Sequence, residues 1–296
     1  MAPTRTPFPV TSEFAQQVMV IQQDEDRPVQ LNFPRYLDTD QNGNIYVGNA
    51  GDGNIIIFDR SGNFLQSIPV LSEGSTMNGL AVTSEGTIYL SADGIIRRID
   101  THGTDKTLPI DSTIAGSVSE LIMNRDNSLL ATNKAGDILR IELDGTVKVI
   151  ASKPFKKYLD ETEHWIGITA DKSGNIYAVG GSTCVVLKFS PDGEYLSQFG
   201  GENRNHVVRD LNDPPGGFPS MDPGYFYEPM AIAVDKYGRV IVSDSTYNVQ
   251  VFDSNGQYVD SLATPNIIRW VIFDHDNNLY MSSDEPEVIK LDVSNP

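Results

Sequence analysis

A unit of strands joined by two tight turns recurs six times along the chain. A glycine or asparagine marks each first turn, and another marks the second turn 17 to 19 residues later. The first-turn residues are Gly43, Gly86, Asn127, Gly174, Gly238 and Asn277. The second-turn residues are Gly62, Gly103, Gly145, Gly193, Gly256 and Asn295. Both residue types tolerate the positive φ of tight hairpins, so the constant spacing predicts six antiparallel sheets of one design.

A period of about forty residues with four strands per unit predicts an all-β protein, a six-bladed β-propeller. The sixth unit ends at Asp292–Pro296, directly after its third strand, whereas residues 14–22 resemble an outer strand without a unit of its own. We expect this N-terminal strand to complete the last blade, because the pairing removes two exposed edges. Residues 1–296 then form a single domain.

The chain is strongly acidic, with 22 Lys and Arg against 40 Asp and Glu and a formal net charge of −18. This charge repels nucleic acid and anionic lipid, so we exclude both as partners. No segment reaches the roughly twenty apolar residues of a membrane span, and the first ten residues lack a signal-peptide core. We expect a soluble monomer, cytoplasmic rather than exported, with an exported form as the open alternative. Cys184, the single cysteine, lies in an apolar strand and is predicted to be a packing residue.

The fifth unit carries the most specific resemblance to known proteins. Its segments Pro229–Asp244 and Asn248–Gly256 resemble an NHL repeat, and the other units match more loosely over about residues 15–295. NHL propellers are similar in fold to the gluconolactonase and senescence-marker lactonases, to strictosidine synthase and to the peptidyl-hydroxyglycine amidating lyase. The resemblance implies a propeller but not an activity, since this fold hosts metal-dependent hydrolysis, carbon–carbon and carbon–nitrogen bond chemistry, and protein binding.

The two faces of the predicted ring differ. Antiparallel strands alternate in direction, so the linkers that lead to each first strand share one face with the loops that follow each second strand. We call this the linker face, and the opposite one, with both sets of turns, the turn face. The linkers vary most in length, which predicts function on their face. The longest, about residues 201–228, is an insertion whose aromatic residues form a lid or an ordinary surface loop. Those aromatic residues are Phe218, Tyr225, Phe226 and Tyr227.

Eight positions before each first-turn residue, the inner strands begin with dissimilar side chains. The set is Arg35, Asn78, Ser119, Ile166, Met230 and Arg269. A purely structural ring would repeat one small residue, so this set predicts a pocket at the mouth of the central channel. Arg35 and Arg269 belong to neighbouring blades, and two guanidiniums that lie together favour a small organic anion such as a carboxylate. Alternatively, each guanidinium pairs with a carboxylate of the protein such as Glu120 or Asp244.

Aromatic and titratable side chains lie next to this ring. We expect Trp165, Trp270 and Asn78 to contact a substrate beside the two arginines. His164 is a candidate general acid or base because its free pKa lies near neutrality, and Glu120 and Tyr36 are further catalytic candidates. The alternative for each of these residues is a packed or hydrogen-bonded structural role.

A metal site is only weakly indicated. Asn78-Gly79-Leu80 resembles the Asn-Gly-Leu that supplies one ligand in the lactonase-type propellers, but Ser119 and Arg35 stand where that resemblance implies acidic ligands. Asn49, Asn133 and Asp244 end matched second strands and are weak candidates for calcium, because amides without clustered carboxylates bind it poorly. We therefore expect no cofactor, with calcium as the alternative.

These patterns together predict a stand-alone propeller that binds a small anionic organic molecule at the channel mouth. We interpret it as a metal-independent lyase, cyclase or hydrolase. Two alternatives stay open: a non-catalytic NHL-type module that binds a protein or peptide, and a calcium-dependent, lactonase-like hydrolase. Neither the substrate nor the reaction can be derived from the sequence.

Overall fold

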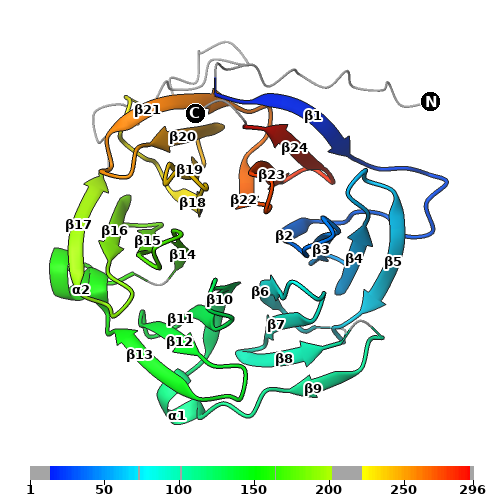
Figure 1. Ribbon diagram of the computed structural model, residues 1–296, viewed down its shortest axis with the longest axis horizontal. Coiled ribbons are helices and arrows are strands. Elements are labelled where there is room, and N and C mark those ends of the chain that lie inside the picture. The colour runs from blue at the N-terminus through cyan, green and yellow to red at the C-terminus, as the bar shows by residue number, and fades with distance from the viewer. Residues whose placement is uncertain (1–13, 73, 101, 164, 202–221, 294–296) are drawn as a thin grey trace.

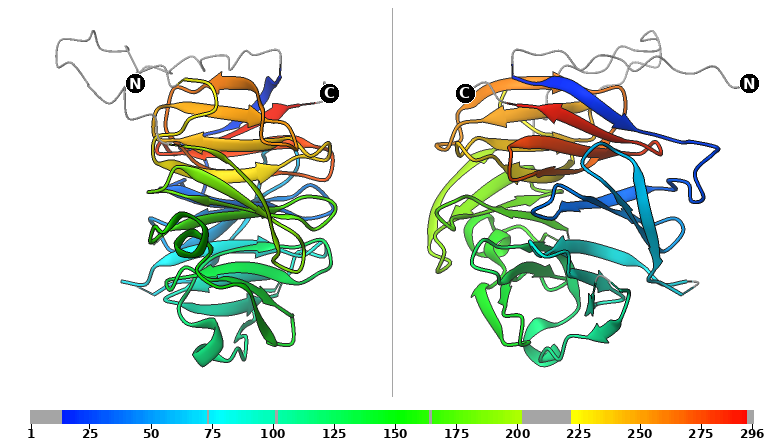
Figure 2. Two further views of the ribbon diagram at one scale, coloured as in Figure 1. Left: turned by 90° about the vertical axis from the view of Figure 1, so that its left-hand side faces the viewer. Right: turned by 45° about the vertical axis from the view of Figure 1, so that its right-hand side comes forward.

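Six sheets, each of four antiparallel strands, stand around a common axis (Figure 1). The computed structural model describes residues 14–293 except 73, 101, 164 and 202–221. Figure 2 shows the ring edge-on, with the strands running from one face to the other. The arrangement confirms the six-bladed β-propeller that the turn spacing predicts.

The strands of each blade follow one another in sequence from the axis outward. Blade 1 is β2 (Pro34–Thr39), β3 (Ile45–Asn49), β4 (Asn54–Phe58) and β5 (Phe64–Pro69), and blade 2 is β6 (Met77–Val82), β7 (Ile88–Ala92), β8 (Ile95–Ile99) and β9 (Asp105–Thr107). Blade 3 is β10 (Val118–Met123), β11 (Leu129–Asn133), β12 (Ile138–Ile141) and β13 (Val147–Ala151), and blade 4 is β14 (Ile166–Ala170), β15 (Ile176–Gly180), β16 (Val185–Phe189) and β17 (Tyr195–Gly200). Blade 5 is β18 (Pro229–Val234), β19 (Val240–Asp244), β20 (Asn248–Phe252) and β21 (Tyr258–Ala263).

Blade 6 closes the ring with a strand from the other end of the chain. It consists of β22 (Ile268–Phe273), β23 (Asn278–Ser283), β24 (Val288–Asp292) and β1 (Gln16–Ile21). β1 runs antiparallel to β24, with Gln16 opposite Asp292 and Ile21 opposite Val288, as the adjacent blue and red strands of Figure 1 show. The predicted closure by residues 14–22 is therefore confirmed, while the expected last turn residue, Asn295, lies outside the described residues.

The turns adopt the backbone conformation that their residues predict. Every described turn residue of both sets has a positive φ, including the two asparagines, Asn127 and Asn277. The aspartates that begin the turns act as caps: Asp40 Oδ1 accepts the backbone N–H groups of Asn42 and Asn44 at 2.8 and 3.0 Å. These hydrogen bonds hold each hairpin closed and occupy the carboxylates, so they support the structure of the turns.

Neighbouring blades are joined by a repeated hydrogen bond near the linker face. A hydroxyl in the second strand donates to a carbonyl at the start of the next inner strand, at 3.1 to 3.3 Å. The donors are Ser91, Thr132, Ser243 and Ser282. Blade 1 has Gly48 at this position, where a Cβ atom would come within 2.6 Å of the Met77 sulfur. There the Tyr36 hydroxyl donates to the Met77 carbonyl instead, at 3.1 Å.

In the described part of the chain, helical structure is confined to two short linker segments. α1 (Ser112–Ala115) precedes β10 and α2 (Pro154–Leu159) precedes β14, and both lie at the rim in Figure 1. Among the described residues, no helix has the length and apolar character to cross a membrane.

Deleting residues 1–24 removes β1 and leaves β24 as the uncovered outer edge of blade 6. Because ring closure depends on this strand, we expect the deletion variant to lose its cooperative thermal transition. Deleting residues 1–13 alone leaves β1 in place and serves as the control. An unchanged transition after the longer deletion, measured by circular dichroism, would contradict the closure argument.

Candidate functional site

Five of the six inner strands contain a register irregularity directly after they begin. In β2, β6, β18 and β22 a single residue is left without a partner in the ladder, and in β10 two residues face one. The unpaired residues are Arg35, Asn78, Met230 and Arg269, and β10 contributes Ser119 and Glu120. A β-bulge re-aims its side chain, so these residues leave the repeating pattern. β14 has a regular ladder.

A cavity of about 530 Å³ lies on the linker face, beside these irregular starts. Its lining comes from the inner-strand starts of four blades and from the loop after β15. The lining residues are Arg35, Trp165, Gly181, Ser182, Cys184, Tyr227, Glu228, Pro229, Met230 and Arg269. Its volume falls in the usual range for small-molecule sites. The structure thus brings three of the predicted substrate contacts together, namely Arg35, Arg269 and Trp165.

The two arginines of this cavity are not equivalent. Arg269 forms a two-pronged ion pair with Asp284, in which Nε bonds Oδ1 and Nη2 lies 3.0 Å from Oδ2. Its Nη1 lies 3.3 Å from the Met230 sulfur. Asp284 follows β23 directly and therefore lies on the linker face. The charge of Arg269 is balanced by this carboxylate, whereas the sequence suggested Glu120 or Asp244 as protein partners.

Arg35 has no carboxylate partner among the residues that the structure describes. Its guanidinium carbon lies 5.9 Å from the centre of the Phe33 ring and 5.7 Å from that of Tyr36. The side chain is half-buried. A guanidinium that contacts only ring faces keeps its five N–H donors available for a planar anion.

Glu120 lines the central channel rather than the linker-face cavity. It is 5% exposed, and its Oε1 accepts the backbone N–H of Ile168 in the next blade at 3.0 Å. Its Oε2 is buried and has no hydrogen-bond partner among the residues that the structure describes. Burial raises the pKa of the Glu120 carboxyl to about 8, and the positive charge of Arg35 opposes part of this rise. Glu120 is therefore largely protonated at neutral pH and lies within the field of Arg35.

Tyr36 and Trp270 pack against each other near the axis. Their rings meet edge to face with centres 4.9 Å apart, and both residues are 5% exposed. Trp270 lines the channel and donates from Nε1 to the Leu37 carbonyl at 3.2 Å. Tyr36 lines neither cavity, and burial raises its pKa to about 12. In this arrangement Tyr36 joins blades 1 and 2 and supports the position of the Trp270 indole.

The remaining predicted site residues lie apart from the linker-face cavity or outside the described residues. Asn78 lines neither cavity, and its Nδ2 donates to the Thr76 carbonyl at 3.3 Å. His164 lies outside the described residues, as does Phe218 of the expected lid. Of the other lid aromatics, Phe226 is fully buried against Phe252 in the core. Tyr225 is 44% exposed, and Tyr227 lines the cavity.

The three calcium candidates accept backbone N–H groups of nearby loops, which for Asn49 is the loop before β2. Asn49 Oδ1 accepts the Asn32 N–H at 2.6 Å, Asn133 Oδ1 accepts the Asp137 N–H at 2.9 Å, and Asp244 Oδ1 accepts the Thr246 N–H at 2.9 Å. In the described part of the chain, no three His, Cys, Asp or Glu side chains cluster as a metal site would require. The three Oδ1 atoms thus accept backbone N–H groups, while the Oδ2 of Asp244 is buried without a hydrogen-bond partner among the described residues.

Sequence reasoning missed several lining residues. Glu228 ends the long linker, and Ser182 lies in the loop after β15; Tyr227, by contrast, is one of the predicted lid aromatics. Two lining residues other than glycine, Cys184 and Glu228, have φ values of 57° and 46°. Such conformations are uncommon and often occur at functional sites. Cys184 is 3% exposed, as its apolar strand predicts. The sequence marks these missed lining residues only by their position, in loops of the face on which the linkers vary in length.

The comparisons with known proteins agree with the fold. No protein-family model and no curated protein matches the chain in sequence, so the NHL resemblance is not confirmed. Among solved structures, a gluconolactonase from Xanthomonas campestris is 17% identical with a TM-score of 0.64 over 98% of both chains. Virginiamycin B lyase from Staphylococcus aureus is 14% identical with a TM-score of 0.64, over 92% of this chain and 98% of that one. A streptogramin B lyase is 16% identical with a TM-score of 0.60, over 87% of this chain and 78% of that one. At such low identities the likeness shows the propeller fold alone.

Three buried carboxyls make the stability of the protein depend on pH. Burial raises the pKa of Asp244 to about 6, of Asp38 to about 7 and of Glu120 to about 8. The folded state then binds more protons than the unfolded state between about pH 5 and 8, so these groups stabilise the fold at low pH and lose this effect as the pH rises. Each contributes a slope of up to roughly 1.4 kcal/mol per pH unit.

Replacing Glu120 by glutamine removes one of these titrations. We expect the free energy of unfolding of Glu120→Gln, measured by urea denaturation, to fall less steeply than that of the wild type across this range. Parallel curves for the two proteins would contradict the pKa assigned to Glu120.

Proposed function

We propose that this protein is an enzyme that binds a small organic anion in the linker-face cavity and acts on it without a metal, as a lyase, cyclase or hydrolase. The observation that carries the proposal is the guanidinium of Arg35, which has no carboxylate partner among the described residues and lines a cavity of about 530 Å³. In a chain with a net charge of −18, abundant carboxylates could have neutralised this cation. A carboxylate group of the substrate takes that role, with Trp165 and Tyr227 against its body.

Glu120 is the acid–base group of this proposal: it lines the inner end of the channel, close enough to Arg35 for that guanidinium to affect its pKa, and we place it at the floor of the linker-face site. It lies near the start of β10, one position after the residue that matches Arg35 in this blade. Burial raises the pKa of its carboxyl, and the positive charge of Arg35 lowers it in part. A protonated carboxyl with one oxygen fixed by the Ile168 N–H can donate its proton to a leaving group or a carbonyl oxygen. Glu228, at the cavity wall, is a second carboxylate in reach of the substrate. His164 stays a candidate base from its place beside Trp165 in the sequence.

The structural neighbours support an enzyme in a general way. Gluconolactonase and streptogramin B lyase are propellers of this fold, and both are enzymes by name. Because folds host many functions, this likeness leaves the reaction type to experiment.

Two substitutions test the anion site in opposite directions. A thermal-shift screen of small carboxylic acids first identifies ligands. For these, Arg35→Met should weaken binding by roughly ten- to a hundredfold, because one charge-assisted interaction is lost. Asp284→Asn should strengthen binding, because it releases Arg269. Arg98→Met, on the exposed face of β8, removes the same charge outside both cavities and is the matched control. Equal affinities for the Arg35 and Arg98 variants would overturn the site.

The proposed catalytic role of Glu120 needs a separate measurement. Ligands from the screen are incubated with the wild type and with Glu120→Gln, and products are followed by mass spectrometry. We expect the wild type to convert at least one ligand and the variant to bind it with similar affinity but convert it at least about a hundredfold more slowly. Ligands that bind at Arg35 but are never converted would contradict the enzyme and favour the binding-module alternative.

A further inference from the structure

A second cavity, of about 480 Å³, occupies the central channel and opens at the opposite face of the ring. Its mouth is on the turn face, because its lining includes residues that lie within the first turns of several blades. Among them are Asn127, Lys236, His275 and Asn277. Arg35 and Arg269 do not line it. The channel is therefore a different compartment from the linker-face cavity, although Glu120 lies at its inner end.

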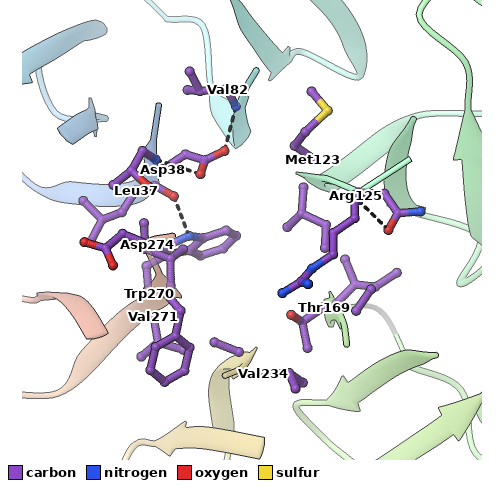
Figure 3. A pocket seen from close by; sticks show the side chains of 18 of the residues that line it. Leu37, Asp38, Val82, Met123, Arg125, Thr169, Val234, Trp270, Val271 and Asp274 are labelled. Atoms are coloured by element: carbon purple, nitrogen blue, oxygen red, sulfur yellow. Dashed lines mark hydrogen bonds between the residues drawn. The ribbon is translucent and has the colours of Figure 1, made fainter. Parts of the chain in front are cut away.

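Arg125 places a free cation in this channel. The residue lies in the first turn of blade 3, and its backbone N–H donates to Asn124 Oδ1 at 2.9 Å. Its guanidinium has no carboxylate partner among the described residues, and the side chain is exposed. Figure 3 shows the guanidinium pointing into the pocket beside Thr169.

Asp38 supplies a carboxyl group to the same space, on the other side of the pocket from Arg125 (Figure 3). Its Oδ2 accepts the Val82 N–H of the next blade at 2.7 Å, and its Oδ1 accepts the Thr39 N–H at 2.8 Å. These two bonds fix its position, yet no cation pairs with it in the described structure. Burial raises the pKa of the Asp38 carboxyl to about 7. A bound cation would favour the ionised form of this carboxyl and would supply its missing counterion.

Between these two groups the channel wall is mainly apolar. Val82, Met123, Val234 and Val271 face the space around the Trp270 indole (Figure 3). The indole is anchored through its Nε1 hydrogen bond to Leu37, so it offers a fixed aromatic surface.

We propose that the channel is a second binding site, for a small zwitterion whose two charged groups stand apart on a partly apolar body, such as a dipeptide with an aromatic or aliphatic side chain. The ligand's carboxylate binds the Arg125 guanidinium and its ammonium group binds the Asp38 carboxylate. Its apolar body packs on Trp270 and the valines. An anion or a cation alone would satisfy only one of the two unpaired groups.

Isothermal titration with matched probes tests this site. Glycyl-L-phenylalanine and L-phenylalanine carry both charges, 3-phenylpropanoate lacks the ammonium group, and 2-phenylethylamine lacks the carboxylate. We expect at least one zwitterion to bind roughly tenfold or more tightly than both single-charge probes. Arg125→Met and Asp38→Asn should each reduce that affinity by a similar factor, while Arg98→Met leaves it unchanged.

The Arg125 variant keeps the test decisive if Asp38→Asn fails to fold, because Arg125 is exposed and its loss leaves no buried group unpaired. Equal binding of the single-charge probes, wild-type affinity in the Arg125 variant, or no binding of either zwitterion at millimolar concentration would each overturn the proposal. The linker-face site can fail independently, since its readout depends on Arg35.

Discussion

The pairing of β1 with β24 is the interaction on which the rest of this structure depends. Each blade of a propeller buries its faces only against its two neighbours, so an open ring would leave two faces and two strand edges in water. The ladder from Gln16 opposite Asp292 to Ile21 opposite Val288 joins the two ends of the chain and closes the circle. Closure fixes the distances between inner strands, and these strands define both the channel and the linker-face cavity.

The β-bulges at the inner-strand starts place residues outside the hydrogen-bond ladder, where they can serve a site without supporting the sheet. A residue without a ladder partner can vary without disturbing the sheet, so Arg35 and Arg269 occupy positions that hold Asn78 and Met230 in other blades. Just outside this ring, four of the six blades instead repeat one contact, a hydroxyl that donates to the next blade. Where Gly48 lacks the hydroxyl, Tyr36 supplies it, which explains why an aromatic residue appears in the ring.

The fold could be predicted because turn residues with positive φ recur at a constant spacing, and the missing outer strand at one end matched an extra strand at the other. Counting from the turns also located Arg35, Arg269 and Trp165 at one cavity. The sequence could not show that Asp284 balances Arg269, because that pairing depends on the conformation of the loop after β23. It likewise could not separate Glu120 and Trp270 into the channel, since side-chain direction at a bulge is set by packing.

The two cavities share an electrostatic feature: among the described residues, each contains an arginine without a carboxylate partner, Arg35 on one face and Arg125 on the other. The central claim is that Arg35, and not the already paired Arg269, receives the ligand anion. NMR of the arginine side-chain Nε–Hε groups, assigned with Arg35→Met and Arg269→Met, measures this directly during titration with a carboxylate from the screen. The account predicts a saturating shift of the Arg35 resonance with a smaller change at Arg269. A shift at Arg269 alone, or at neither arginine, would contradict it.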